Sequence, residues 1–162
     1  TLEKTIEVVD NPTKLYEIDG KIYLISQGNY ADVAGALQII DPATGTSKVI
    51  LNDATKITEG HDDLIYGVRA TYDANWQLTN SFFIYNPKMG DVSETSFLQD
   101  APSSFSTAAI YLLEVDEETG FIYVGTSDYT TNGTIYQFDK MGKFVQSFDS
   151  GGINPSAMVF VD

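Results

Sequence analysis

The chain has 162 residues, no cysteine and a formal net charge of −14 at pH 7. Without cysteine, disulfides, thiolate nucleophiles and cysteine-ligated zinc are all excluded. The negative charge disfavours nucleic acid and anionic membrane surfaces as partners, because both would be repelled. Hydrophobic residues make up 43% of the chain and aromatic residues 12%, which is enough to form a folded core rather than a disordered tail.

Short strands separated by tight turns are predicted along the whole chain. A single strand is expected at 2–9, followed by a first unit of four strands that we letter A to D. The apolar or alternating runs of this unit, from A to D, are 14–18, 21–24, 37–40 and 46–51. Strands C and D are joined at 41–45 by Asp-Pro-Ala-Thr-Gly, a sequence typical of a tight turn.

Two further units follow the same order, and a last single strand is expected at 157–161. The strands of the second unit are expected at 55–59, 64–67, 82–85 and 91–98. The strands of the third unit are expected at 108–115, 121–124, 135–138 and 143–149. Small residues at 106–109 open strand A of the third unit, as suits a strand beside a narrow central channel.

Constant spacing identifies the three units as copies of one repeat. Each strand B holds a tyrosine, and these are Tyr23, Tyr66 and Tyr123, spaced 43 and 57 residues apart. The distance along the chain from this tyrosine to the Asp or Asn that opens the C–D turn is 18, 20 and 16 residues in the three units. In each turn the Asp or Asn accepts backbone hydrogen bonds, and a later glycine supplies the positive φ.

Four-stranded repeats of this length predict an all-β protein made of β-propeller blades. A two-sheet sandwich of hairpins is the alternative, although a sandwich does not need equal offsets. The expected divisions are the last strand of a preceding blade at 1–10, blades at 11–52, 53–99 and 100–150, and the first strand of a ring-closing blade at 151–162. Three blades and two strands do not close a ring. We therefore expect either N-terminal blades outside this sequence or a second copy to complete it.

Four stretches near the end carry a resemblance to a known family. They are Gly-Phe-Ile-Tyr-Val-Gly-Thr-Ser-Asp-Tyr at 120–129, Asn-Gly-Thr-Ile-Tyr at 132–136, Met-Gly-Lys-Phe-Val-Gln-Ser-Phe at 141–148 and Gly-Ile-Asn-Pro at 152–155. Together they resemble the final blade of the YncE-like propellers, more closely the exported propellers of gut anaerobes that carry a domain of unknown function. The resemblance is specific over about 110–162, and only the blade pattern matches over 11–100. Gly67 and the insertion at 75–77 depart from that pattern.

The resemblance implies the C-terminal part of a seven-bladed ring in an exported, non-enzymatic protein of the periplasm or cell surface. Many such proteins are surface lipoproteins beside an outer-membrane transporter, and some relatives capture cobalamin for it. A signal and an anchor would then lie outside this sequence. The family's ligand contacts do not match this chain residue by residue, so none is carried over.

The face that carries the D–A and B–C loops is the expected binding face, because ligands usually dock there in propellers. Three tyrosines, 7, 6 and 6 residues past the strand-B tyrosine, are predicted in the B–C loops. Aromatic rings supply apolar area and neighbouring polar groups fix orientation, which suits a flat polar ligand such as a sugar or a corrin ring. The alternative is that these tyrosines cap blade edges. The predicted contacts are Asn29, Tyr30, Asp32, Tyr72, Asp73, Asn75, Trp76, Asp128 and Tyr129.

Two acidic turns carry groups that metals or acid/base chemistry use, but neither turn predicts a chemical site. His61-Asp62-Asp63 lies in an A–B turn on the opposite face, and one histidine with acidic neighbours is weak support for a metal or an acid/base pair. Asp116-Glu117-Glu118 offers oxygen ligands for Ca²⁺, but a solvated acidic hairpin explains it better. No Ser/His/Asp arrangement and no glycine-rich phosphate loop stands out. We therefore predict no catalytic residue, no metal and no cofactor.

The function predicted from the sequence is a non-enzymatic ligand-capture or scaffold propeller of unknown ligand, serving an outer-membrane uptake system for cobalamin or a glycan. The carboxylate-rich loops leave a second possibility, a propeller enzyme acting on glycans as a lyase or hydrolase. A third is a protein–protein interaction module whose wide face meets a partner.

Overall fold

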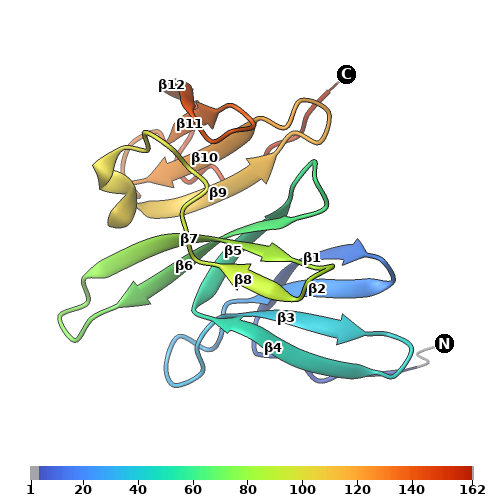
Figure 1. Cartoon of the computed structure of the whole chain (residues 1–162). Coiled ribbons are helices and arrows are strands. Elements are labelled where there is room, and N and C mark those ends of the chain that lie inside the picture. The colour runs from blue at the N-terminus through green and yellow to red at the C-terminus, as the bar shows by residue number, and fades with distance from the viewer. Residues whose placement is uncertain (1–3, 162) are drawn as a thin grey trace. The chain divides into compact units, whose positions relative to one another are not determined.

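The computed structural model describes residues 4–161, which form an all-β structure of three four-stranded antiparallel sheets and one short 3-10 helix (Figure 1). The first sheet, blade one, has its strands in sequence order. Its strands are β1 (Pro12–Ile18), β2 (Lys21–Ser26), β3 (Ala36–Asp41) and β4 (Thr46–Asn52).

Blades two and three repeat this up-and-down order. Blade two contains β5 (Ala54–Glu59), β6 (Ile65–Tyr72), β7 (Leu78–Asn86) and β8 (Asp91–Ser93). Blade three follows the 3-10 helix η1 (Ser103–Ser106) and contains β9 (Ala109–Val115), β10 (Ile122–Ser127), β11 (Thr134–Phe138) and β12 (Phe144–Asp149). The predicted all-β class and the three blades with strands A to D are confirmed.

The chain forms two compact units, Thr1–Ile57 and Thr58–Asp162, with their border inside β5. The first unit holds blade one, and the second holds blade three with most of blade two. Within the described residues, no helix has both the length and the apolar character that a membrane crossing requires.

The C–D turns have the predicted chemistry. In the first turn, Asp41 Oδ1 accepts hydrogen bonds from the backbone N–H groups of Ala43 and Thr44 at 2.9 and 3.3 Å. Asn86 and Asp139 do the same in the other two turns. Each turn includes a glycine with a φ of 71° to 79°, where a side chain would be strained; these are Gly45, Gly90 and Gly142.

Strand register confirms that the strand-B tyrosines are equivalent. Each pairs with the strand-C residue that lies two positions before the Asp or Asn of the C–D turn. The pairs are Tyr23 with Ile39, Tyr66 with Ile84, and Tyr123 with Gln137. The unequal offsets of the sequence therefore reflect different lengths of the whole B–C hairpin, strands and loop together, and not different blade designs.

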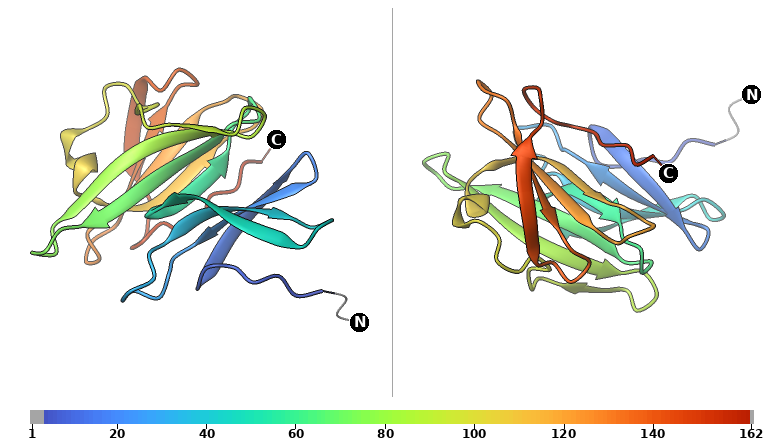
Figure 2. Two further views of the ribbon diagram at one scale, coloured as in Figure 1. Left: turned by 60° about the horizontal axis from the view of Figure 1, so that its bottom comes forward. Right: turned by 90° about the horizontal axis from the view of Figure 1, so that it is seen from above.

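A single hydrophobic core joins blades two and three within the second unit. Phe105 lies in η1, which begins directly after Pro102. Its side chain is 2% exposed and packs edge-to-face on Tyr136, with the ring centroids 4.8 Å apart. Phe97 packs in the same way on Tyr66 at 4.8 Å. Figure 2 shows η1 beside the β6–β7 hairpin, which it contacts. Buried aromatic area of this kind fixes the two sheets relative to each other.

Strand D of blade two is shorter than predicted. The run 91–98 was expected as one strand, but β8 ends at Ser93. Leu98 is 7% exposed and Phe97 packs against Phe82 at 5.5 Å, so the chain leaves the sheet edge and enters the inter-blade core. Burying two large apolar side chains outweighs continuing an edge ladder whose hydrogen bonds water can replace.

The start of blade three also differs from prediction. Residues 106–109 were expected to open strand A, whereas Ser106 ends η1 and β9 begins at Ala109. Asn80 in β7 holds this connection, because its Nδ2 donates to the carbonyl oxygens of Phe105 and Ala108 at 2.9 and 2.6 Å. The connection is thus anchored to blade two before the next strand begins.

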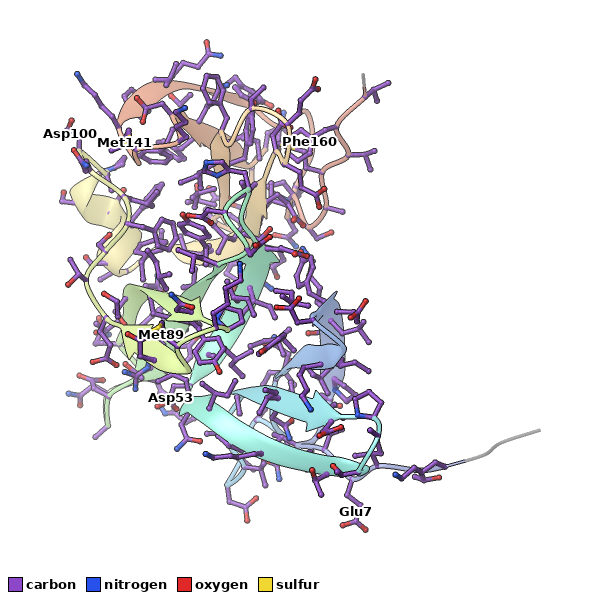
Figure 3. The ribbon with its side chains drawn as sticks, turned by 45° about the vertical axis from the view of Figure 1, so that its right-hand side comes forward. Glu7, Asp53, Met89, Asp100, Met141 and Phe160 are labelled. Atoms are coloured by element: carbon purple, nitrogen blue, oxygen red, sulfur yellow. The ribbon has the colours of Figure 1, made fainter. Side chains whose placement is uncertain are left out.

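Neither predicted terminal strand is present in the described residues, which corrects that expectation. Of the run 2–9, residues 2 and 3 lie outside the described part, and residues 4–9 form no strand; nor do residues 157–161. A strand needs a hydrogen-bonding neighbour, and those expected here would belong to other blades. Instead, the N–H of Val9 donates to Gln38 Oε1 at 2.9 Å. Near the other end lies Phe160, which is labelled in Figure 3. Its ring packs on Tyr123, with the ring centroids 5.3 Å apart.

Gly67 departs from the blade pattern for a packing reason, and its replacement tests the core. A Cβ on Gly67 would lie 2.1 Å from Cζ of Phe83, a fully buried ring. We expect Gly67→Ala to lower the free energy of unfolding by about 1–3 kcal/mol through overpacking. Urea denaturation followed by circular dichroism measures this. Gly152→Ala is the matched control, because nothing lies within 4 Å of its Cβ position. Equal stability of the two variants would show that Phe83 yields freely.

Candidate functional site

The candidate site lies on the B–C loops, each of which joins two long central strands. These loops cover residues 27–35, 73–77 and 128–133. The first lies in the first compact unit, and the other two lie in the second. In Figure 1 the β6–β7 hairpin turns at the same side of the second unit as the start of β9, the D–A side of blade three.

Each B–C loop contains one aromatic residue in the left-handed backbone conformation. The residues are Tyr30, Trp76 and Tyr129, with φ values of 59°, 61° and 66°. A bulky residue in this region is uncommon and costs roughly 1–2 kcal/mol. The same strained conformation at three loop tips directs a large exposed ring outward from each loop.

Asn29 holds the first of these loops. Its Oδ1 accepts hydrogen bonds from the backbone N–H groups of Ala31, Asp32 and Val33 at 3.0, 3.1 and 2.9 Å. Its Nδ2 donates to Asp32 Oδ1 at 2.8 Å. Asn29 and Asp32, both predicted ligand contacts, therefore act within the loop and fix the backbone around Tyr30. Ligand contact by either residue stays a prediction.

Asp128 has the corresponding position in blade three. Its Oδ1 accepts from the N–H groups of Thr130 and Thr131 at 2.8 and 2.7 Å, and its Oδ2 accepts from the Thr131 hydroxyl at 2.7 Å. The backbone hydrogen bond from Thr131, followed by that from Thr130, holds the pKa of Asp128 well below its ordinary value. The carboxylate is therefore charged throughout the physiological range while it anchors the loop.

Asp73 anchors the blade-two loop in the same manner. Its Oδ1 accepts from the N–H groups of Asn75 and Gln77, both at 2.8 Å. Strand β6 is two residues longer than β2 or β10, so Tyr72 is the last residue of the strand and not a loop residue as predicted. Trp76, and not Tyr72, is the residue equivalent to Tyr30 and Tyr129.

Four aromatic side chains gather on this side of blades two and three, and we call them the aromatic cluster: Tyr72, Trp76, Tyr111 and Tyr129. The Tyr72 and Trp76 ring centroids are 6.3 Å apart at 57°, and those of Tyr111 and Tyr129 are 5.6 Å apart at 80°. Tyr72 and Tyr129 are each 59% exposed and Trp76 is 80% exposed. Burial, then the charges of the Tyr111 and Tyr72 phenols, raise the pKa of Tyr129. The ring contacts join these residues in two pairs, one on blade two and one on blade three, and we treat both pairs together as the cluster.

Tyr111 was missed by the sequence analysis. It lies in β9, a strand A that was expected to carry small residues. No signal in the sequence singles it out. Its place beside the B–C loop follows from strand pairing, because Ala109, two residues before Tyr111, lies opposite Ser127, the last residue before that loop. Tyr30 lies in the other compact unit, where it is 80% exposed, and remains a separate predicted contact.

Three acidic residues of the A–B turns, Asp62, Asp63 and Asp116, make contacts with other side chains. Asp62 Oδ2 accepts from the Tyr66 hydroxyl at 3.0 Å, and Asp63 pairs with Lys88 at 2.8 Å. The hydroxyl of Thr119 donates to Asp116 and lowers the pKa of that carboxyl. Among residues 4–161, no group of three histidine or acidic side chains is arranged to hold a metal ion.

Comparison with solved structures assigns the architecture. The β-propeller domain of the trilobed protease from Pyrococcus furiosus, which has an open velcro topology, superposes with a TM-score of 0.57 and 11% sequence identity. The alignment covers 88% of this chain and 43% of that one. The fold is that of β-propeller blades. The chain spans less than half of the structure it matches, and at this identity the similarity concerns the fold alone.

Other comparisons add no family. TolB from Acinetobacter baumannii aligns with a TM-score of 0.30 and 13% identity, over 74% of this chain and 38% of that one, which is too low a score to support an argument. No family model and no curated protein matches the sequence. Membership of the YncE-like family therefore stays a prediction.

The pH dependence of stability tests the anchoring role of Asp128. Because its folded pKa is depressed below the unfolded value of about 3.9, its contribution to stability is present above that value and is lost as the pH falls below it. Asp128→Asn keeps an acceptor, as Asn29 does, but does not titrate. We expect its free energy of unfolding to fall less than that of the parent between about pH 5 and pH 2.5. Parallel curves from urea denaturation would contradict this role.

Backbone strain at Tyr129 gives a second test. Tyr129→Gly and Tyr129→Ala both remove the ring, but only glycine adopts a φ of 66° without cost. We expect the glycine variant to be more stable than the alanine variant by about 1 kcal/mol. Equal unfolding free energies, measured by urea denaturation, would show that the loop relaxes when the ring is removed.

Proposed function

We propose that this protein is a non-enzymatic binding module, in which propeller blades hold the aromatic cluster as a ligand-binding surface. The observation that carries the proposal is the cluster itself, four aromatic rings drawn from two blades, three of them more than half exposed. Single apolar residues scattered over a surface are ordinary and need no explanation. Large exposed aromatic residues gathered at one place are instead characteristic of binding sites.

Two features support a binding role for these residues. First, Trp76 and Tyr129 are kept in a strained backbone conformation that glycine would adopt more easily, and strain of this kind concentrates at functional sites. Second, the loops are short and are fixed by Asp73 and Asp128, so little conformational entropy is lost when a ligand binds.

A wider role follows from the resemblance of 110–162 to the YncE-like propellers. On that basis we propose an exported protein of the periplasm or cell surface that delivers its ligand to an outer-membrane uptake system. Further blades outside this sequence, or a second copy, would complete the ring. This wider role makes cobalamin and glycans candidate ligands, and both are included in the binding experiment below.

Ligand binding is tested with the intact chain by saturation-transfer NMR and isothermal titration calorimetry against cobinamide, cobalamin, a glycan panel and small organic cations. We expect one of these classes to bind, and Trp76→Ala to weaken its binding by at least about tenfold, as for a central aromatic contact. Met141→Ala is the matched control. It removes a large exposed side chain, 67% exposed against 80% for Trp76, at the end of β11 opposite the B–C loop.

Three results would contradict the proposal. Binding that Trp76→Ala leaves unchanged would place the ligand elsewhere. Absence of binding by every class would favour a protein-interaction module. Turnover of a glycan, abolished by Asp73→Asn or Asp128→Asn, would make the protein an enzyme.

A further inference from the structure

The rings of the aromatic cluster are tilted and do not form a flat platform. Tyr72 and Trp76 meet at 57°, and Tyr111 and Tyr129 meet at 80°. A flat sugar or corrin ring stacks best on one open ring face. A compact rounded group can instead contact two tilted rings at once, and the Tyr72 and Trp76 centroids, 6.3 Å apart, are close enough for one such group to contact both rings.

The charges around the cluster are negative. Asp73 directly follows Tyr72, and Asp128 directly precedes Tyr129. The loops 73–77 and 128–133 contain no lysine, arginine or histidine. Arg69, the basic residue of β6, is three positions before Tyr72 and pairs with Glu94. The local field therefore has the same sign as the net charge of −14, and it attracts cations and repels anions.

Aromatic rings and carboxylates together favour one class of ligand. A cation placed over the face of Trp or Tyr, within about 6 Å of the centroid, is attracted by the ring quadrupole, and groups of tilted aromatic rings bind quaternary ammonium ions in this way. The carboxylates of Asp73 and Asp128 add long-range attraction, although their oxygens are bonded to the loop backbone and are not needed for direct contact. Neutral sugars gain nothing from this field.

Resting on the binding role proposed above, we infer that the aromatic cluster recognises a quaternary ammonium group, such as the trimethylammonium head of a small metabolite. The tilted rings of Tyr72 and Trp76 contact the methyl groups. Asp73 and Asp128 supply the negative field.

Trp76 is the only tryptophan of the chain, so its fluorescence reports the site directly. The test titrates the intact chain with choline and tetramethylammonium, and with 3,3-dimethylbutan-1-ol, which has the shape of choline but no charge. We expect saturable changes in Trp76 emission with both cations, and affinity for the neutral alcohol lower by roughly tenfold. Raising the salt concentration should weaken binding of choline and not of the alcohol.

Variants separate ring recognition from loop stability. Tyr72→Phe keeps the ring and should bind choline as the parent does, whereas Tyr72→Ala should lose most of the affinity. Circular dichroism checks that both remain folded, and Met141→Ala is again the unaffected control. Equal binding of choline and the neutral alcohol, or glycan binding without choline binding, would overturn the ammonium inference and leave the binding role standing. If no ligand of any class binds, the binding role itself fails.

Discussion

The aromatic packing between blades two and three is the interaction on which the rest of the second unit depends. A four-stranded sheet has two faces, and Phe105, Tyr66 and Phe138 bury one face of each sheet against the other. The aromatic cluster takes Tyr72 and Trp76 from one sheet and Tyr111 and Tyr129 from the other. The position of the two ring pairs relative to each other therefore depends on this core, which holds the two sheets together away from the loops.

The part of the fold that could be predicted from the sequence consists of residues whose hydrogen-bond partners lie only a few positions away along the chain. Asp41, Asn86 and Asp139 each act on backbone groups two to four positions away, so a single sequence contains both partners of the interaction. Their regular spacing from the strand-B tyrosines then identified the blades. The exposed aromatics of the B–C loops were found in the same way, because loops between apolar strands lie at the surface.

The parts that prediction missed depend on contacts between distant segments. Strand β8 stops early because Phe97 reaches Tyr66, 31 positions back along the chain, and Tyr111 joins Tyr129 only through strand pairing. The position of Tyr72 could not be judged from its offset, since β6 and β10 differ in length by two residues. The terminal strands failed for a related reason: an apolar run becomes a strand only when a neighbouring strand pairs with it.

In the B–C loops, the side chains that fix the loop backbone are different from the aromatic side chains that the loop exposes to solvent. Asn29, Asp73 and Asp128 secure the backbone, while a loop residue at positive φ carries the exposed ring. That residue directly follows Asn29 and Asp128, and it lies three positions after Asp73. A change at such a tip alters recognition without disturbing the anchor. Mutation at a loop tip can therefore replace the exposed ring while the anchoring side chain keeps the loop backbone in place, so the proposed binding surface can diversify without rebuilding a blade.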